Sequence, residues 1–146
     1  MRVVATFALL LCSACFTVSD GDTECSIDDH CGAGFSCTRT LECEPTSTLS
    51  STRLNWTVDG IAPTINDGSA CAGIAELEVV FDDGFNQLST HYAPVPCEIG
   101  QAFYDKMPSR FDLVILVAKD NAGRRIDSQS ASIRTGENVV DLDLRP

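Results

Sequence analysis

Four cysteines near the N-terminus follow one another at a constant spacing, with five residues between neighbours. With His30 among them, they could offer thiolate and imidazole ligands to a zinc ion. The sequence has no Cys-x-x-Cys pair of the kind found in zinc knuckles, so we predict disulfides here and no metal. Of the three possible pairings we favour the interlaced one, Cys25 with Cys37 and Cys31 with Cys43, because it crosses the chain instead of closing two independent loops.

The two histidines are the residues best suited to general acid–base catalysis. His30 follows Asp28 and Asp29, and His91 lies in a Ser-Thr-His-Tyr run. Nucleophile-elbow, metalloprotease, P-loop and dinucleotide-binding motifs are absent from the sequence. We therefore predict no catalytic residues, no cofactor and no enzyme, and we keep a small secreted hydrolase that uses His91 as an alternative.

Aspartates in the predicted turns could offer oxygen ligands to calcium. The candidates are Asp82 with Asp83 and, in neighbouring loops, Asp59 and Asp67. Aspartate is also a common turn residue for conformational reasons alone, and the sequence has no twelve-residue EF-hand loop. We interpret these residues as turn formers rather than metal ligands.

The length and net charge of the chain limit the number of domains it can form and the kinds of partner it can bind. The 146 residues suffice for one ordinary domain with an appendage. The 10 basic and 21 acidic residues give a net charge of −11, which repels the phosphate backbone of nucleic acids. We therefore predict a folded protein with no nucleic-acid partner.

Residues 1–14 have the pattern of a signal peptide, in which Arg2 precedes an apolar run at residues 3–11 and small residues follow. The run is shorter than the roughly 20 residues needed to span a bilayer. Its end, Leu11-Cys12-Ser13-Ala14-Cys15, resembles the lipobox of bacterial lipoproteins. The resemblance implies cleavage before Cys15 and attachment of lipid to its sulfur.

The number of cysteines agrees with a lipid anchor. Loss of Cys12 and lipidation of Cys15 leave six of the eight cysteines, enough for three disulfides. Residues 15–24 would form a lipid-anchored spacer. Phe16 stands where an Asp keeps many such lipoproteins in the inner membrane, so the resemblance implies the outer membrane, on its periplasmic or cell-surface face. Plain secretion is the alternative.

Residues 25–43 form a separate cysteine-rich segment, which includes the pattern Asp-x-x-Cys-Gly-x-Gly-aromatic-x-Cys at residues 28–37. So short a segment cannot bury enough apolar surface to fold unaided, so its two disulfides must hold it together. The pattern resembles the short cysteine-rich modules that follow the lipid anchor in many bacterial lipoproteins.

A linker rich in Ser, Thr and Pro is expected at residues 44–52. Beyond it, apolar and polar residues alternate in short runs, as at residues 54–58, 75–81 and 140–144. This period predicts strands with one face in water, and Asp-Gly and similar pairs between the runs predict turns. We expect residues 53–146 to form an all-β, seven-stranded antiparallel β-sandwich, stapled by a disulfide between Cys71 and Cys97.

One predicted strand is apolar on both faces. We expect Phe111, Leu113, Ile115 and Val117 to point into the core, which leaves the opposite face apolar as well. Either a neighbouring segment covers that opposite face, or it is an exposed patch that docks a partner. This candidate binding face consists of Val114, Leu116 and Ala118.

Residues 101–123 contain Phe103, a Met107-Pro108 pair, the alternating apolar run, Asp120 and Gly123. This stretch resembles the carboxypeptidase-regulatory-like and transthyretin-like β-sandwiches, which are accessory modules. The resemblance implies the sandwich fold and transfers no catalytic residue. We therefore expect a non-catalytic, lipid-anchored cell-envelope protein whose sandwich binds or scaffolds an envelope protein or a glycan. The alternative is a structural accessory subunit of an envelope complex.

Overall fold

The computed structural model of the chain describes residues 25–85 and 88–146. The expected signal peptide, the lipidation site Cys15 and the spacer up to residue 24 lie outside the described residues. Within the described ranges, no helix combines the length and the hydrophobicity needed to cross a membrane.

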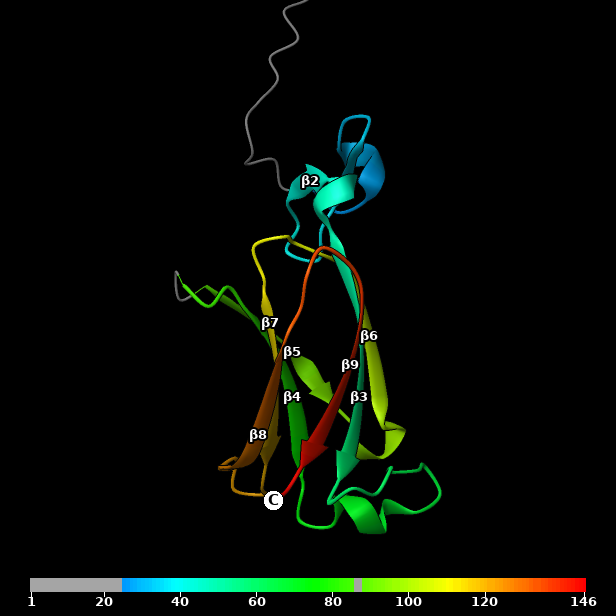
Figure 1. Cartoon of the computed structure of the whole chain (residues 1–146), viewed down its shortest axis with the longest axis vertical. Coiled ribbons are helices and arrows are strands. Elements are labelled where there is room, and N and C mark those ends of the chain that lie inside the picture. The colour runs from blue at the N-terminus through cyan, green and yellow to red at the C-terminus, as the bar shows by residue number, and fades with distance from the viewer. Residues whose placement is uncertain (1–24, 86–87) are drawn as a thin grey trace, which may run out of the picture.

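Two β-sheets pack face to face below a small N-terminal subdomain (Figure 1). In the described chain, the first sheet has three strands in the order β6-β3-β9, and the second has four in the order β5-β4-β7-β8. The first comprises β3 (Ser50–Val58), β6 (Gln101–Met107) and β9 (Gly136–Leu144). The second comprises β4 (Glu76–Asp82), β5 (Ser89–Val95), β7 (Leu113–Lys119) and β8 (Arg125–Ser132). The all-β, seven-stranded sandwich predicted from the alternation is confirmed.

The pairing of β3 with β9 differs from the antiparallel arrangement that we expected. These two strands, the first and last of the sandwich, run parallel from Ser50 beside Gly136 to Val58 beside Leu144. A parallel neighbour requires a long connection, and the whole intervening sandwich supplies it. The short 3-10 helices η3 (Gly68–Cys71) and η4 (Cys97–Ile99) complete the connections at the far end.

The core consists of the inward side chains of both sheets, and Phe81 lies at its centre. The Phe81 side chain is 0% exposed, and its ring meets those of Tyr92, Tyr104 and Phe111 edge-on at centroid distances of 5.7, 5.2 and 6.4 Å. Edge-to-face contacts of this kind are favourable for aromatic rings. Burial raises the pKa of Tyr104 to about 12, so its hydroxyl stays neutral inside the sandwich.

Strand β7 has the opposite orientation from the one expected. Val114, Leu116 and Ala118 are each 0% exposed and belong to the core, so the prediction that they form a binding face is wrong. The partly exposed outward side chains are Leu113, Ile115 and Val117. Since both sets are apolar, alternation cannot choose between them. The pairing of β7 with β4 determines which face of β7 is buried. Leu116 lies opposite the buried Val79, and cross-strand partners share a face.

The N-terminal subdomain, which we call the cysteine-rich module (residues 25–45), contains η1 (Asp28–His30) and a small antiparallel sheet of β1 (Phe35–Cys37) and β2 (Cys43–Pro45). The prediction of a linker at residues 44–52 is wrong. Strand β2 is followed directly by η2 (Thr46–Thr48) and by β3, which begins at Ser50. Ser50 and Thr52 are 3% and 0% exposed, because they already pair with β6 and β9.

Ion pairs attach the cysteine-rich module to the sandwich. Arg110, in the turn between β6 and β7, reaches Glu42 at 2.5 Å and Glu44 at 3.3 Å with its two Nη atoms. Arg39 of the module makes a 2.5 Å contact with Asp105 of β6. Each contact joins residues that lie more than sixty positions apart in the chain. The module therefore packs against the sandwich through side-chain contacts and is not connected to it by the chain alone.

Lys106 completes this attachment with an unusual backbone conformation. Its φ of 51° lies in the left-handed region, which costs free energy for a residue other than glycine. In this position its carbonyl accepts a hydrogen bond from Arg39 N at 3.1 Å, and its Nζ contacts Asp28 Oδ2 at 2.7 Å. The hydrogen bond from Lys106 holds the pKa of Asp28 below its usual value. Contacts with the module thus support a bend at the end of β6.

Candidate functional site

The outward face of the three-stranded sheet carries polar side chains in regular rows. Because Leu54, Trp56 and Val58 of β3 point into the core, the residues between them point outward. Strand register then sets the rows: Arg53 lies beside Phe103 and Val139, Asn55 beside Gln101 and Asp141, and Thr57 beside Asp143. We call these eight side chains the β3 face.

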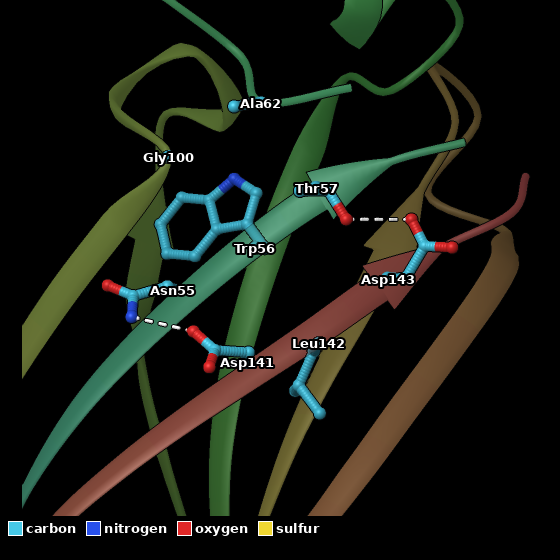
Figure 2. Close-up of a pocket in the computed structure, with 8 residues that line it drawn as sticks. All are labelled: Asn55, Trp56, Thr57, Ala62, Gly100, Asp141, Leu142 and Asp143. Carbon is cyan, nitrogen blue, oxygen red and sulfur yellow. Dashed lines mark hydrogen bonds between the residues drawn. The ribbon is translucent and has the colours of Figure 1, made fainter. Parts of the chain in front are cut away.

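Parallel pairing of β3 with β9 joins two of these rows by side-chain hydrogen bonds (Figure 2). Asn55 Nδ2 donates to Asp141 Oδ1 at 2.8 Å, and Thr57 Oγ1 donates to Asp143 Oδ1 at 2.7 Å. The two aspartates lie two residues apart on one face of β9, as do Asn55 and Thr57 on β3. The result is a fixed ladder of amide, hydroxyl and carboxylate groups.

Asp143 is the most strongly held member of the ladder. Besides the hydroxyl of Thr57, its Oδ1 accepts the backbone N–H of Gly60 at 2.7 Å, and its Oδ2 accepts from Arg145 Nε at 3.0 Å. These donors, Thr57 foremost, lower the pKa of Asp143. The carboxylate therefore stays ionised and oriented near neutral pH.

A pocket of about 290 Å³ lies along the ladder, with Ala62 and Gly100 at its border (Figure 2). The wall that includes Gly100 is held by Trp56, whose Nε1 donates to Cys97 O at 2.8 Å and whose backbone N–H donates to Gly100 O at 3.0 Å. Gly100 has a φ of 65°, and an added Cβ would lie 3.3 Å from Pro63 O. Glycine is thus the residue that fits this turn.

Phe103 gives the β3 face an exposed aromatic ring. It is 53% exposed although it lies in mid-strand, and the Arg53 guanidinium lies 5.7 Å from the ring centroid. A cation at this distance orients the ring. Val139, on the other side of Arg53, is 68% exposed. The polar ladder therefore continues into an aromatic and aliphatic row on the same flat surface.

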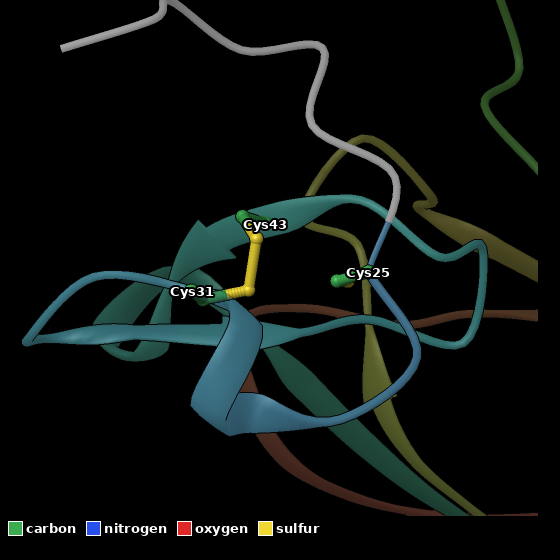
Figure 3. A group of neighbouring side chains, drawn as sticks. All are labelled: Cys25, Cys31 and Cys43. Atoms are coloured by element: carbon green, nitrogen blue, oxygen red, sulfur yellow. A yellow bond between two sulfur atoms is a disulfide. The ribbon is translucent and has the colours of Figure 1, made fainter. Parts of the chain in front are cut away.

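The disulfides follow the predicted pairing in all three cases within the described chain. Cys25 bonds to Cys37, Cys31 to Cys43, and Cys71 to Cys97. Figure 3 shows the bond between Cys31 and Cys43 with Cys25 nearby. The sulfur atoms of these three residues lie within 4.8 Å of one another. Each is already bonded to another sulfur, so the cluster offers no thiolate to a metal.

The aspartates considered for calcium lie in or next to turns. Asp82 Oδ1 accepts the backbone N–H of Gly84 at 2.7 Å, and Asp67 Oδ1 accepts that of Ser69 at 3.0 Å. Asp83 Oδ1 accepts from Phe85 N at 3.2 Å. Asp59 occupies a turn with a φ of 51°. The contacts of Asp67, Asp82 and Asp83 are the side-chain to backbone hydrogen bonds through which aspartate stabilises turns.

The two histidines have different surroundings. His30, the last residue of η1, is exposed, and its Nδ1 lies 3.4 Å from Ser26 Oγ. His91 is in contact through both ring nitrogens: Nδ1 lies 2.6 Å from Glu78 Oε1, and Nε2 lies 3.2 Å from Ser89 Oγ. These three side chains stand on the outward face of the four-stranded sheet, on the opposite side of the molecule from the β3 face.

The β3 face itself was missed in the sequence. Alternation shows that Asn55, Thr57, Asp141 and Asp143 point away from the core. It does not show that β3 and β9, which lie more than eighty residues apart in the chain, are neighbours. The exposed Phe103 was noticed only as part of a family resemblance.

Comparison of the chain with protein-family models and with curated protein sequences found no match.

Proposed function

We propose that the protein is a lipid-anchored binding module of the cell envelope and that its β3 face binds a neutral saccharide. The observation that carries the proposal is the fixed polar ladder beside the exposed ring of Phe103. Saccharides present hydroxyls that donate and accept hydrogen bonds, and C–H faces that pack against aromatic rings. Amide, hydroxyl and carboxylate groups supply the matching donors and acceptors, and the ring supplies the apolar contact.

Rigidity of the site favours this use. Asn55, Thr57, Asp141 and Asp143 hold one another through hydrogen bonds before any ligand arrives, so binding does not have to order them. Groups that are already fixed lose less entropy on association.

The charge of the molecule favours a neutral ligand. The net charge is −11, and the ladder itself contributes Asp141 and Asp143. Anionic glycans and phosphorylated lipids would be repelled before contact. A neutral oligosaccharide meets no such electrostatic repulsion, and its hydroxyls can donate hydrogen bonds to the two carboxylates.

The position of the pocket suits an anchored protein. The cysteine-rich module, which follows the proposed lipid anchor at Cys15, adjoins the start of β3 (Figure 1). The pocket is lined by Asn55, Trp56 and Thr57, near the other end of that strand. A strand of nine residues spans about 30 Å. The docked module would separate the pocket from the proposed spacer and lipid anchor by about the length of β3.

Titration calorimetry with a panel of neutral hexasaccharides tests the binding proposal. The panel contains a β-1,4-glucan, an α-1,4-glucan and an N-acetylglucosamine oligomer, with an oligogalacturonate as the anionic control. We expect saturable binding to a neutral member, weakened about tenfold by Asn55→Ala or Phe103→Ala and unchanged by Ser130→Ala on the opposite sheet. Absence of binding to every neutral member, or an affinity insensitive to both substitutions, would overturn the proposal.

Intact mass, measured before and after reduction on protein from detergent-solubilised membranes, tests the anchor. We expect the mass of residues 15–146 plus acyl groups, with six hydrogens gained on reduction of the three disulfides. A soluble, unacylated chain with a free thiol at Cys15 would contradict the lipid anchor and favour secretion. Neither result affects the saccharide test, which depends on the β3 face alone.

A further inference from the structure

We propose that Ser89 is an activated nucleophile that accepts an acyl group from a carboxylic ester, with His91 as its general base and Glu78 as the group that orients His91. The proposal concerns the outward face of the four-stranded sheet and is independent of saccharide binding on the β3 face. It rests on the order and geometry of three side chains.

The β-sheet brings the three side chains together. Ser89 and His91 lie two residues apart on β5, so both point to the same face. His91 pairs with Val80 of β4, and Glu78 stands two residues before Val80 on the same face. The imidazole therefore lies between the hydroxyl and the carboxylate, as the distances of 3.2 Å and 2.6 Å to its two nitrogens show.

The carboxylate sets the tautomer of His91. Glu78 Oε2 pairs with Lys119 Nζ at 2.9 Å, while Oε1 faces His91 Nδ1. Lys119 first and His91 second lower the pKa of Glu78, so the carboxylate is ionised and can only accept. The proton of the neutral imidazole then resides on Nδ1, and the lone pair on Nε2 faces the hydroxyl of Ser89.

This arrangement has the connectivity of a serine nucleophile, base and orienting acid. In the reaction, Ser89 Oγ attacks the ester carbonyl and passes its proton to His91 Nε2. A bond forms between Oγ and the carbonyl carbon, and the carbon–oxygen bond to the alcohol breaks. The proton on Nε2 moves to the departing alcohol oxygen. Water then attacks the acyl-serine with His91 again as base, which releases the carboxylic acid and restores Ser89.

Access to the relay is open from solvent. The His91 side chain is 57% exposed, and Ser89 is exposed at the start of β5. Next to the relay, Val80, Leu113, Ile115 and Val117 form an apolar stripe on the same face. An ester with a hydrocarbon acyl chain could lie along this stripe with its carbonyl at Ser89, because apolar contact removes such a chain from water.

Labelling with a fluorophosphonate probe tests the proposal on the mature chain. The probe loses fluoride as it forms a bond to an activated serine oxygen, and peptide mass spectrometry identifies the serine. We expect Ser89 to be labelled at least about 100-fold faster than Ser130, an exposed serine on β8 of the same sheet, since general-base assistance contributes about 10²–10⁴-fold. Hydrolysis of p-nitrophenyl butyrate gives a second readout.

Three variants separate reactivity from folding, because all three positions lie on the surface. Ser89→Ala should abolish the label and the esterase rate, and His91→Gln should slow both about 100-fold. Ser130→Ala, the matched control, should leave both unchanged. Labelling of Ser89 no faster than of Ser130, or a rate that His91→Gln does not change, would overturn the proposal.

Discussion

The cysteine-rich module and the sandwich are stabilised by different forces. In the module, the buried side chains are Cys25, Ser36, Cys37 and Thr38, and two interlaced disulfides replace a hydrophobic core. The sandwich has a continuous apolar core drawn from both sheets. A segment too short to bury apolar surface must be held covalently, whereas two facing sheets can rely on the hydrophobic effect.

The junction between the two regions depends on charge. Arg110, Arg39 and Lys106 each reach an acidic residue across the boundary, and these side chains are partly exposed. Ion pairs in water contribute little individually. The comparison therefore predicts that the module can be loosened by salt, acid or reduction under conditions that leave the sandwich folded.

The largest effect is expected in the core of the sandwich. Phe81→Ala should lower the free energy of unfolding by about 3–5 kcal/mol, because it removes a buried ring and leaves a cavity. Urea denaturation followed by Trp56 fluorescence measures the loss. Both module disulfides should still form, as peptide mapping would show. A loss below about 1 kcal/mol would mean that Phe81 is not at the centre of the core.

Removing one disulfide from each region sharpens the comparison. Cys71→Ala with Cys97→Ala should lower the stability of the sandwich by about 3 kcal/mol, because the bond closes a long loop. Cys31→Ala with Cys43→Ala should make residues 25–45 sensitive to protease, while the Trp56 transition shifts by less than about 1 kcal/mol. If loss of the Cys31–Cys43 bond destabilised the sandwich as much as loss of the Cys71–Cys97 bond, the two regions would form one cooperative unit.

A smaller effect is expected at the junction. Arg110→Ala removes the contacts with Glu42 and Glu44 and should cost about 1 kcal/mol at low salt, with the loss shrinking as salt is added. Hydrogen exchange of the module amides measures this loss of stability. Arg134→Ala, at an exposed arginine, is the matched control. Equal protection in both variants would show that Arg110 does not hold the module.

The smallest effect is expected from acid. Hydrogen bonding to Lys106 lowers the pKa of Asp28 in the folded protein. The stabilisation is therefore present above the unfolded pKa of about 4 and is lost as pH falls through the lower folded value. Chemical shifts of Asp28 and of the Lys106 amide should change together in that window. A module that stays docked after Asp28 has been protonated would contradict this role.

Local patterns predicted much of the fold. The interlaced disulfide pairing was preferred because it crosses the chain, and alternation located the strands of the sandwich. Two features could not be predicted because they depend on which segments pair with each other. Both faces of β7 are apolar, so its orientation is set only by its pairing with β4. Residues 44–52 have a linker composition, yet Ser50 and Thr52 pair with β6 and β9.

The candidate sites were harder to predict for the same reason. The ladder of Asn55 with Asp141 and Thr57 with Asp143 requires the parallel pairing of the first and last strands of the sandwich. His91 was identified as the candidate base from its residue type alone. Its partners Ser89 and Glu78 emerge only when β5 is aligned with β4.

The most direct test of the central claim is a nuclear magnetic resonance titration of the ¹⁵N-labelled mature chain with the neutral hexasaccharides. The account predicts that the side-chain amide signals of Asn55 and Gln101 and the backbone signal of Phe103 shift with a common saturation curve. Signals of Val117 and Ser130 on the opposite sheet should stay in place. Shifts confined to the four-stranded sheet, or no shift with any neutral saccharide, would contradict a binding role for the β3 face.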